Sequence, residues 1–122
     1  MTEERILVQR EGTFHYPIVF RKDFSSLSEE VLSLSKKSRR ICVVSDSHVA
    51  PLYLDTVTKE LGKCGMKVTA YILPAGESNK NLDQIQGIYE HLIQEHFDRN
   101  DMLAALGGGV TGDMTGFAAA TY

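Results

Sequence analysis

The sequence lacks the marks of several protein classes. It contains no tryptophan and only two cysteines, Cys42 and Cys64, too few for a disulfide framework or a cysteine metal site. No apolar run approaches the roughly 20 residues that cross a bilayer, and the polar start of the sequence lacks a signal-peptide core. The net charge of −3 provides no basic surface for nucleic acid or membranes. We therefore expect a cytoplasmic protein without nucleic-acid or membrane partners, in which both cysteines are small hydrophobic residues.

What is present fits one globular domain over residues 1–122. A hydrophobic content of 43% and a charged content of 24% are ordinary for a domain with a buried core. Segments 5–10 and 16–21 have strand patterns on either side of a turn, which predicts an antiparallel hairpin. Apolar residues three and four positions apart then predict a helix over 25–37.

The remaining sequence alternates between the patterns of buried strands and of helices. Strands are expected at 41–44, 67–73 and 102–106, and helices at 49–61, 82–97 and 109–122. Such alternation predicts a parallel sheet covered by helices. The expected fold class is therefore α/β, with a Rossmann-like parallel sheet flanked by helices and an N-terminal antiparallel β-hairpin.

Three of these elements carry further expectations. The apolar run 102–106 predicts a third buried strand. Helix 82–97 is expected to share one apolar face among Ile85, Ile88, Tyr89, Leu92 and Ile93. Residues 118–122 continue a helix without a stop signal, which favours a piece of a longer protein over a natural terminus.

A run of glycines, Gly107–Gly109, begins the last helix. Glycine lets the backbone approach a ligand closely, and the first N–H groups of a helix attract an anion such as a pyrophosphate. Gly107, Gly109 and Gly112 fit the G-x-G-x-x-G spacing, but that fingerprint normally opens the first βαβ unit. The run therefore predicts a phosphate loop of another topology. The alternative is a glycine turn that packs the helix tightly on the sheet.

Polar residues follow each predicted parallel strand, and each has two interpretations. Asp46 either accepts the hydroxyls of a ribose or caps the next helix. In the segment 74–80, Lys80 and Glu77 meet a phosphate and a hydroxyl, or the segment is a solvated loop. Asp113, expected in the first turn of its helix, contacts a ribose or nicotinamide, or is stabilised by the helix dipole. Because the carboxyl ends of parallel strands share one edge, these loops converge, which favours dinucleotide binding.

No pattern in the sequence indicates catalysis or a metal site. The four histidines are not spaced as metal ligands, although His48 could line a pocket beside Asp46. Neither a nucleophile with a neighbouring histidine nor a pair of catalytic carboxylates stands out. We expect no catalytic residue and no metal ligand within this chain.

Two long motifs resemble the 3-dehydroquinate synthase family. The segment 104–122, AALGGGVTGDMTGFAAATY, closely resembles the signature of that family, and 74–80, PAGESNK, resembles its Gly-Glu-x-x-Lys loop. Segments 44–46 and 16–19 resemble its first nucleotide-contacting turn and its N-terminal hairpin. The likeness spans most of the chain and implies a dehydroquinate synthase-like N-terminal domain that binds NAD.

The resemblance implies an NAD-dependent lyase of the shikimate pathway, which leads to the aromatic amino acids. This family converts 3-deoxy-D-arabino-heptulosonate 7-phosphate, a sugar-acid phosphate, into 3-dehydroquinate and phosphate. NAD oxidises a hydroxyl transiently, and a divalent metal, zinc or cobalt, acts as a Lewis acid. The metal ligands of the family lie in a C-terminal helical domain beyond this sequence. The full-length enzyme is expected to be a homodimer, and this chain alone is expected to be inactive.

Carried over position by position, the resemblance also implies a cofactor site. Asp46 would hold the adenosine ribose, Glu77 and Lys80 would make the main polar contacts of their loop, and Gly108 and Gly109 would approach the pyrophosphate. Asp113 would contact the nicotinamide side of the cofactor. The expected cofactor-binding residues are Asp46, Ala75, Gly76, Glu77, Ser78, Asn79, Lys80, Gly108, Gly109, Val110, Thr111, Gly112 and Asp113.

Related families share part of this pattern. Other sugar-phosphate cyclases and iron-type alcohol or glycerol dehydrogenases also have the triple glycine and the aspartate, although the segment 116–122, GFAAATY, favours the cyclases. His48 departs from the family, which commonly has asparagine at that position. A non-catalytic nucleotide-binding module is an alternative of another class.

Overall fold

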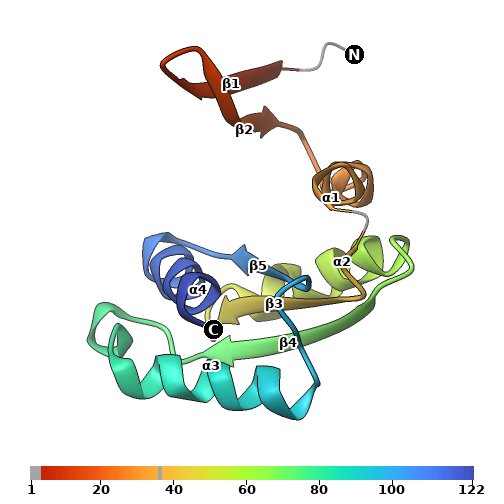
Figure 1. Cartoon of the computed structure of the whole chain (residues 1–122). Helices are drawn as coiled ribbons and strands as arrows, with labels where there is room; N and C mark the ends of the chain where they lie inside the picture. The colour runs from red at the N-terminus through yellow and green to blue at the C-terminus, as the bar shows by residue number, and fades with distance from the viewer. Residues whose placement is uncertain (1–3, 36) are drawn as a thin grey trace.

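The computed structural model describes residues 4–35 and 37–122. An antiparallel hairpin of β1 (Glu4–Arg10) and β2 (Thr13–Phe20) precedes helix α1 (Leu27–Leu34) and lies away from the other strands (Figure 1). The elements that follow are β3 (Arg40–Asp46), α2 (Ala50–Gly62), β4 (Lys67–Leu73), the 3-10 turn η1 (Glu77–Asn79), α3 (Leu82–Gln94), β5 (Met102–Leu106) and α4 (Gly109–Thr121). Within the described ranges, no helix has the length and apolar character needed to cross a membrane.

Strands β3, β4 and β5 form a parallel sheet in the order β4-β3-β5, with β3 in the centre. Helices α3 and α4 pack on one face of β3, around Cys42 and Val44, while α1 and α2 pack on the other, around Ile41 and Val43. All four of these β3 residues are fully buried. The predicted α/β class, with its flanked parallel sheet and N-terminal hairpin, is confirmed.

The two predicted core cysteines differ in their surroundings. Cys42 lies in the centre of the sheet, where burial raises the pKa of its thiol to about 11. Cys64 is half-buried, and burial also raises its pKa. Both thiols therefore stay protonated near neutral pH, as expected of residues that contribute packing rather than chemistry.

Two predicted helices are longer than the real ones. Helix α1 has eight residues instead of the predicted span 25–37. Helix α3 ends at Gln94 because His96 adopts a left-handed conformation with φ of 63°. The N–H groups of His96 and Phe97 then donate to the carbonyls of Ile93 and Leu92, at 3.1 and 2.9 Å, which closes the helix in a Schellman arrangement. No glycine marks this helix end in the sequence, so the prediction ran past it.

Two burial predictions were wrong. Strand β5 is half-buried rather than buried, and its Ala105 is exposed, because β5 is an edge strand with β3 as its one partner in the described sheet. Ile93 is 62% exposed although it follows the buried Leu92. Successive residues are turned by about 100° around a helix axis, so Ile93 leaves the face shared by Ile85 and Ile88.

A close approach between β4 and α3 makes one helical glycine necessary. A Cβ atom at Gly87 would overlap the hydroxyl oxygen of Tyr71 and lie 3.2 Å from its Cζ. We expect Gly87→Ala to lower the free energy of unfolding by about 1–3 kcal/mol, as overpacking does, despite the better helix propensity of alanine. Urea unfolding of the variant and the wild-type chain measures this loss.

A second substitution separates the clash from other effects. In a Tyr71→Phe background the overlapping oxygen is gone, so Gly87→Ala should cost much less there than in the wild-type chain. Gly62→Ala, in α2, is a matched control because nothing lies within 4 Å of its Cβ position. Equal losses with and without the tyrosine hydroxyl would contradict the explanation.

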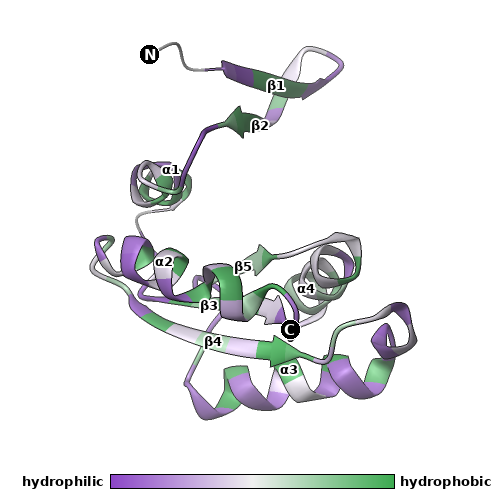
Figure 2. Cartoon of the chain, turned by 180° about the vertical axis from the view of Figure 1, so that it is seen from behind, coloured by the Kyte–Doolittle hydropathy of each residue, from purple (hydrophilic) through white to green (hydrophobic). Residues whose placement is uncertain are grey.

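Most residues of the hairpin are exposed. Hydrophobic residues occupy the middle of β1 and much of β2, yet no other sheet or helix among the described residues covers one of its faces (Figure 2). The pairing shifts register between Val8 and Gln9, where β2 has one residue more than β1. The link to α1 includes an ion pair between Arg5 and Glu30, with 2.8 Å between Nη2 and Oε1.

Candidate functional site

The loops that follow the three parallel strands are tied together by two serines. The N–H of Ser47 donates to the carbonyl of Leu73, and the Ser47 hydroxyl accepts from the N–H of Ala75, both at 2.9 Å. The buried Ser45 hydroxyl donates to the carbonyl of Leu106 at 2.8 Å. The ends of β4 and β5 are thus attached to the end of β3. The predicted convergence of the three loops on one edge is confirmed.

Asp46, the last residue of β3, holds the turn that leads into α2. Its Oδ1 accepts the N–H groups of His48 and Val49, each at 2.9 Å, and its Oδ2 accepts the hydroxyl of Thr111 at 3.2 Å. The hydrogen bond from Val49, with further ones from His48 and Thr111, lowers the pKa of Asp46 against the opposing effect of burial. The N-cap of α2 is Val49, with no side-chain hydrogen bond, so the prediction that Asp46 caps the helix was wrong: Asp46 holds the turn that leads into it. The Oδ2 atom of Asp46 accepts one side-chain hydrogen bond, from Thr111, and faces the glycine run.

The three glycines of Gly107–Gly109 have different roles. Gly107 has φ of 156°, and a Cβ there would lie 3.1 Å from both Asp46 Oδ2 and Thr111 Oγ1. At Gly108 and Gly109, in contrast, a Cβ would meet nothing within 4 Å. Gly108 is the N-cap of α4 and has no side chain to accept the first N–H groups of that helix. The packing interpretation therefore fits Gly107, while Gly108 and Gly109 leave the start of the helix open, and the phosphate-loop interpretation stays a prediction.

Lys80 and Asp113 connect the loop after β4 to α4. Lys80 Nζ lies 2.8 Å from Asp113 Oδ2 and 3.9 Å from Glu77 Oε1. The hydrogen bond to Asp113, with the charges of Asp113 and Glu77, raises the pKa of Lys80. Asp113 is the fifth residue of α4, so the prediction that it lies in the first turn was wrong. Its carboxylate is stabilised by the ion pair with Lys80 rather than by the helix dipole. The lysine and aspartate side chains are 42% and 63% exposed, which makes this a weak pair open to exchange.

The other predicted site residues fall into supporting and exposed groups. Thr111 is 1% exposed, so its hydroxyl acts by positioning Asp46. The Asn79 amide donates to the carbonyl of Ala75 at 3.1 Å and holds the loop in shape. Val110 is half-buried, and the exposed members are Gly76, Ser78 and Gly112.

Sequence reasoning missed three residues that build the site. Ser45 and Ser47 fix the strand ends, and Gly107 makes room for the Asp46 carboxylate. Serine is a common helix cap and turn residue, so a serine beside a strand end does not by itself indicate a partner in another loop. Gly107 is part of the glycine motif, but the spacing of the motif does not show which of its glycines packs closely and which leave open space.

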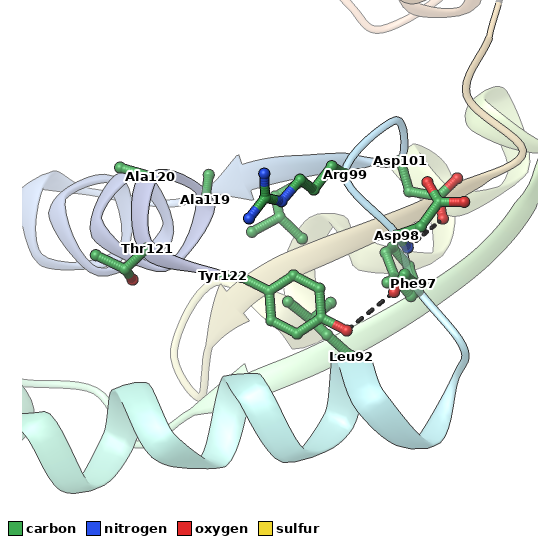
Figure 3. A pocket seen from close by; sticks show the side chains of 10 residues that line it. Leu92, Phe97, Asp98, Arg99, Asp101, Ala119, Ala120, Thr121 and Tyr122 are labelled. Carbon is green, nitrogen blue, oxygen red and sulfur yellow. Dashed lines mark hydrogen bonds between the residues drawn. The ribbon is translucent and has the colours of Figure 1, made fainter.

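A cavity of about 440 Å³ lies elsewhere, at the other end of the sheet (Figure 3). It lies between the end of α4 and the loop before β5, and Arg99, Leu103 and Tyr122 line it. The Tyr122 hydroxyl donates to the carbonyl of Phe97 at 2.9 Å across one side of it. Ligands of open α/β sheets bind at the carboxyl ends of the strands, whereas this cavity is at the amino end of β5. The candidate site is therefore the edge that holds Asp46.

The fold and this strand-end site define an α/β domain of the dehydroquinate synthase-like type. A solved 2-deoxy-scyllo-inosose synthase complexed with carbaglucose-6-phosphate, NAD+ and Co2+ is similar, with a TM-score of 0.69 and 27% identity over 77% of this chain and 26% of that one. Another structure of 2-deoxy-scyllo-inosose synthase has the same fold, with a TM-score of 0.76 and 24% identity over 98% of this chain and 33% of that one.

Matches by sequence identify the family more specifically than the solved structures do. Residues 70–122 match the family model described as 3-dehydroquinate synthase N-terminal. The 3-dehydroquinate synthase of Shewanella piezotolerans is 43% identical over 98% of this chain and 32% of its own length. That of Latilactobacillus sakei is 50% identical over 69% of this chain and 24% of its own length. The chain therefore belongs to the 3-dehydroquinate synthase family, as the motifs implied, and it spans between about a quarter and a third of these relatives.

Proposed function

We propose that residues 1–122 form the NAD-binding domain of a cytoplasmic 3-dehydroquinate synthase. The whole enzyme would convert 3-deoxy-D-arabino-heptulosonate 7-phosphate to 3-dehydroquinate and phosphate in the shikimate pathway, with a further helical domain for the metal and most of the substrate. One observation carries the proposal. Asp46, Lys80 and the uncapped start of α4 meet at the carboxyl edge of the sheet, where a dinucleotide would bind.

The residues of this edge suit the parts of NAD. The first N–H groups of α4 and the open sides of Gly108 and Gly109 suit a pyrophosphate, since a helix start attracts anions and no Cβ stands in the way. The Asp46 carboxylate, held by two backbone N–H groups, suits the hydroxyls of a ribose. Bound NAD supplies the hydride acceptor. This chain binds the cofactor and fixes its orientation.

Lys80 and Asp113 extend the site beyond the pyrophosphate. Lys80 suits a phosphate oxygen because its ion pair is exposed and can exchange partners, and Asp113 suits the nicotinamide side. Across residues 4–35 and 37–122, no group of three or more His, Cys, Asp or Glu side chains could hold a metal ion. We assign no step of the reaction to a metal held by these residues.

A titration followed by amide NMR tests cofactor binding. Addition of NAD is expected to shift the signals of segments 46–48, 75–80 and 107–113, while Arg99 and Thr121, beside the other cavity, stay unchanged. We expect a dissociation constant above the micromolar range, because the chain holds only part of the site. Lys80→Gln should weaken binding at least about threefold, the loss of one charge-assisted contact.

Lys63→Gln is the matched control for Lys80. Lys63 is also exposed and paired with a carboxylate, Glu60, at 2.7 Å, but it lies at the far end of α2. The Lys63→Gln variant should bind NAD with the same affinity as the wild-type chain. Equal weakening by both variants, or shifts centred on Arg99, would overturn the assignment of the site, and sub-micromolar affinity would show that the site here is nearly complete.

Another sugar-phosphate cyclase is the second candidate function, because the solved structures that match are 2-deoxy-scyllo-inosose synthases. The higher identity to 3-dehydroquinate synthases, 43% against 27% and 24%, supports the first candidate. Release of phosphate from the heptulosonate phosphate by the protein that carries this chain tests it directly. Oxidation of glycerol without that release would instead indicate a dehydrogenase.

A further inference from the structure

The loop after β4, residues 74–80, is held in shape by hydrogen bonds within itself. It begins with Pro74, which has no N–H, so Ala75 carries the first backbone donor after the strand. Gly76 has φ of 114° and turns the chain at this point. The side-chain amide and the backbone N–H of Asn79 donate to the carbonyls of Ala75 and Gly76, both at 3.1 Å. The loop is therefore a compact unit whose parts keep their relative positions.

Within the described part of the chain, polar contacts attach this loop to the other strand-end loops at two places. At its start, the Oγ atom of Ser47 accepts the N–H of Ala75 at 2.9 Å. At its end, Lys80 forms the ion pair with Asp113, with 2.8 Å between Nζ and Oδ2. The ion pair is exposed, and it is the contact that Lys80 would exchange for a phosphate oxygen of NAD. The hydrogen bond to Ser47 is then the attachment that remains.

Ser47 is fixed by its own backbone to both strands that precede these loops. It follows Asp46 in the turn after β3, and its N–H donates to the carbonyl of Leu73 at 2.9 Å. This bond continues the pairing of β3 with β4 one residue beyond the last register pair, Asp46 with Leu73. From this fixed position the Ser47 hydroxyl contacts the loop that carries Lys80. The same turn therefore holds the carboxylate proposed for the ribose and the loop whose lysine is proposed for the phosphate.

We infer that Ser47 is a positioning residue for the cofactor, whose hydroxyl holds loop 74–80 so that Lys80 meets NAD at a fixed separation from Asp46. The inference rests on the proposed NAD-binding function and adds to it a residue outside the proposed nucleotide contacts. A loop without this attachment has to be ordered when the ligand binds, and that ordering weakens the affinity. Because Ser47 is exposed, its replacement should change the affinity for NAD more than the stability of the fold.

Substitution of Ser47 tests the inference by an NMR titration with NAD. Ser47→Ala should raise the dissociation constant of NAD about threefold to tenfold, while Ser47→Thr, which keeps the hydroxyl, should stay within about twofold of the wild-type chain. Ser33→Ala is the matched control, because Ser33 is also exposed and its hydroxyl donates to the carbonyl of Glu30 within α1. This control should bind NAD with the wild-type affinity. Without NAD, the Ala75 N–H should exchange with solvent faster in Ser47→Ala than in the wild-type chain and Ser47→Thr.

Double variants show through which contact Ser47 acts. In a Lys80→Gln background the loop has already lost its proposed phosphate contact, so Ser47→Ala should change the dissociation constant there by less than about twofold. In a Gly109→Ala background, at the proposed pyrophosphate position, Ser47→Ala should keep its full effect. Equal effects in the two backgrounds would overturn the inference, because a hydroxyl that contacts NAD directly would act independently of Lys80.

The outcomes separate this inference from the proposed function. If the wild-type chain binds NAD and Ser47→Ala binds it equally well, the inference alone is wrong. Unchanged exchange of the Ala75 N–H in Ser47→Ala, or a failure of Ser47→Thr to keep the wild-type affinity, would also overturn it. A wild-type chain without any NAD-dependent shift would overturn the proposed function, and the positioning role of Ser47 would fall with it.

Discussion

Replacement of Gly107 by alanine is expected to lower the free energy of unfolding by about 1–3 kcal/mol, the usual cost of a backbone conformation that only glycine adopts freely. The new Cβ would lie 3.1 Å from the Asp46 carboxylate and from the Thr111 hydroxyl. Both groups must shift, and their hydrogen bond joins β3 to α4. Urea unfolding measures the loss, and amide NMR signals of segment 46–49 should move with it.

Gly109→Ala should behave in the opposite way. A Cβ at Gly109 meets nothing within 4 Å, and alanine is the better helix former by up to about 1 kcal/mol, so stability should stay the same or rise. If the proposed pyrophosphate site is correct, this variant nevertheless binds NAD more weakly, because the added methyl group occupies the approach to the helix start. Equal destabilisation by both substitutions would contradict the division of roles among the glycines.

Asp46→Ala is expected to cost about 1–2 kcal/mol of stability and to reduce NAD binding. The substitution leaves two backbone N–H groups in the turn before α2 and the buried Thr111 hydroxyl without their acceptor. Asp46→Asn keeps the shape and loses the charge, so its cost should be smaller. Asp113→Asn is the matched control for stability alone, since Asp113 is 63% exposed and its ion pair contributes little to the free energy of unfolding.

The effect of Asp46 should also depend on pH. Its pKa is lowered in the folded chain, so its contribution is fully present above the unfolded value of about 3.9 and is lost as the pH falls through the folded pKa. The stability difference between the wild-type chain and Asp46→Asn should therefore be constant from neutral pH down to about pH 4 and shrink below it. A difference that did not change with acidification would mean that shape alone, and not charge, matters at this position.

The strands of the parallel sheet and the location of the site were predictable because both depend on local patterns. The apolar run at Ile41–Val44 is typical of a strand covered on both faces, and the structure buries all four residues. Parallel strands place their carboxyl ends at one edge, so the loops containing Asp46, Lys80 and Gly108 had to converge once the alternation of strands and helices was recognised.

Several features could not be predicted, because they depend on contacts between segments far apart in the sequence. Asp113 was expected either to contact a ribose or nicotinamide or to be stabilised by its own helix dipole, and neither interpretation anticipated that the fold brings Lys80 within 2.8 Å of it. The end of α3 depends on a left-handed His96, a conformation that sequence patterns associate with glycine. The edge position of β5 follows from the strand order, which the spacing of the strands does not specify.

By itself the sequence determined the α/β class, the hairpin, the family and the three loops of the candidate site. Those features follow from hydrophobic periodicity and from motifs, which are properties of neighbouring residues. Only the tertiary structure decided which glycine packs closely and which two leave space. It also decided that Asp46 holds the turn before α2 while facing Thr111, and that the hairpin leaves an apolar face uncovered. These depend on which atoms of distant segments meet, and packing of the whole chain sets that arrangement.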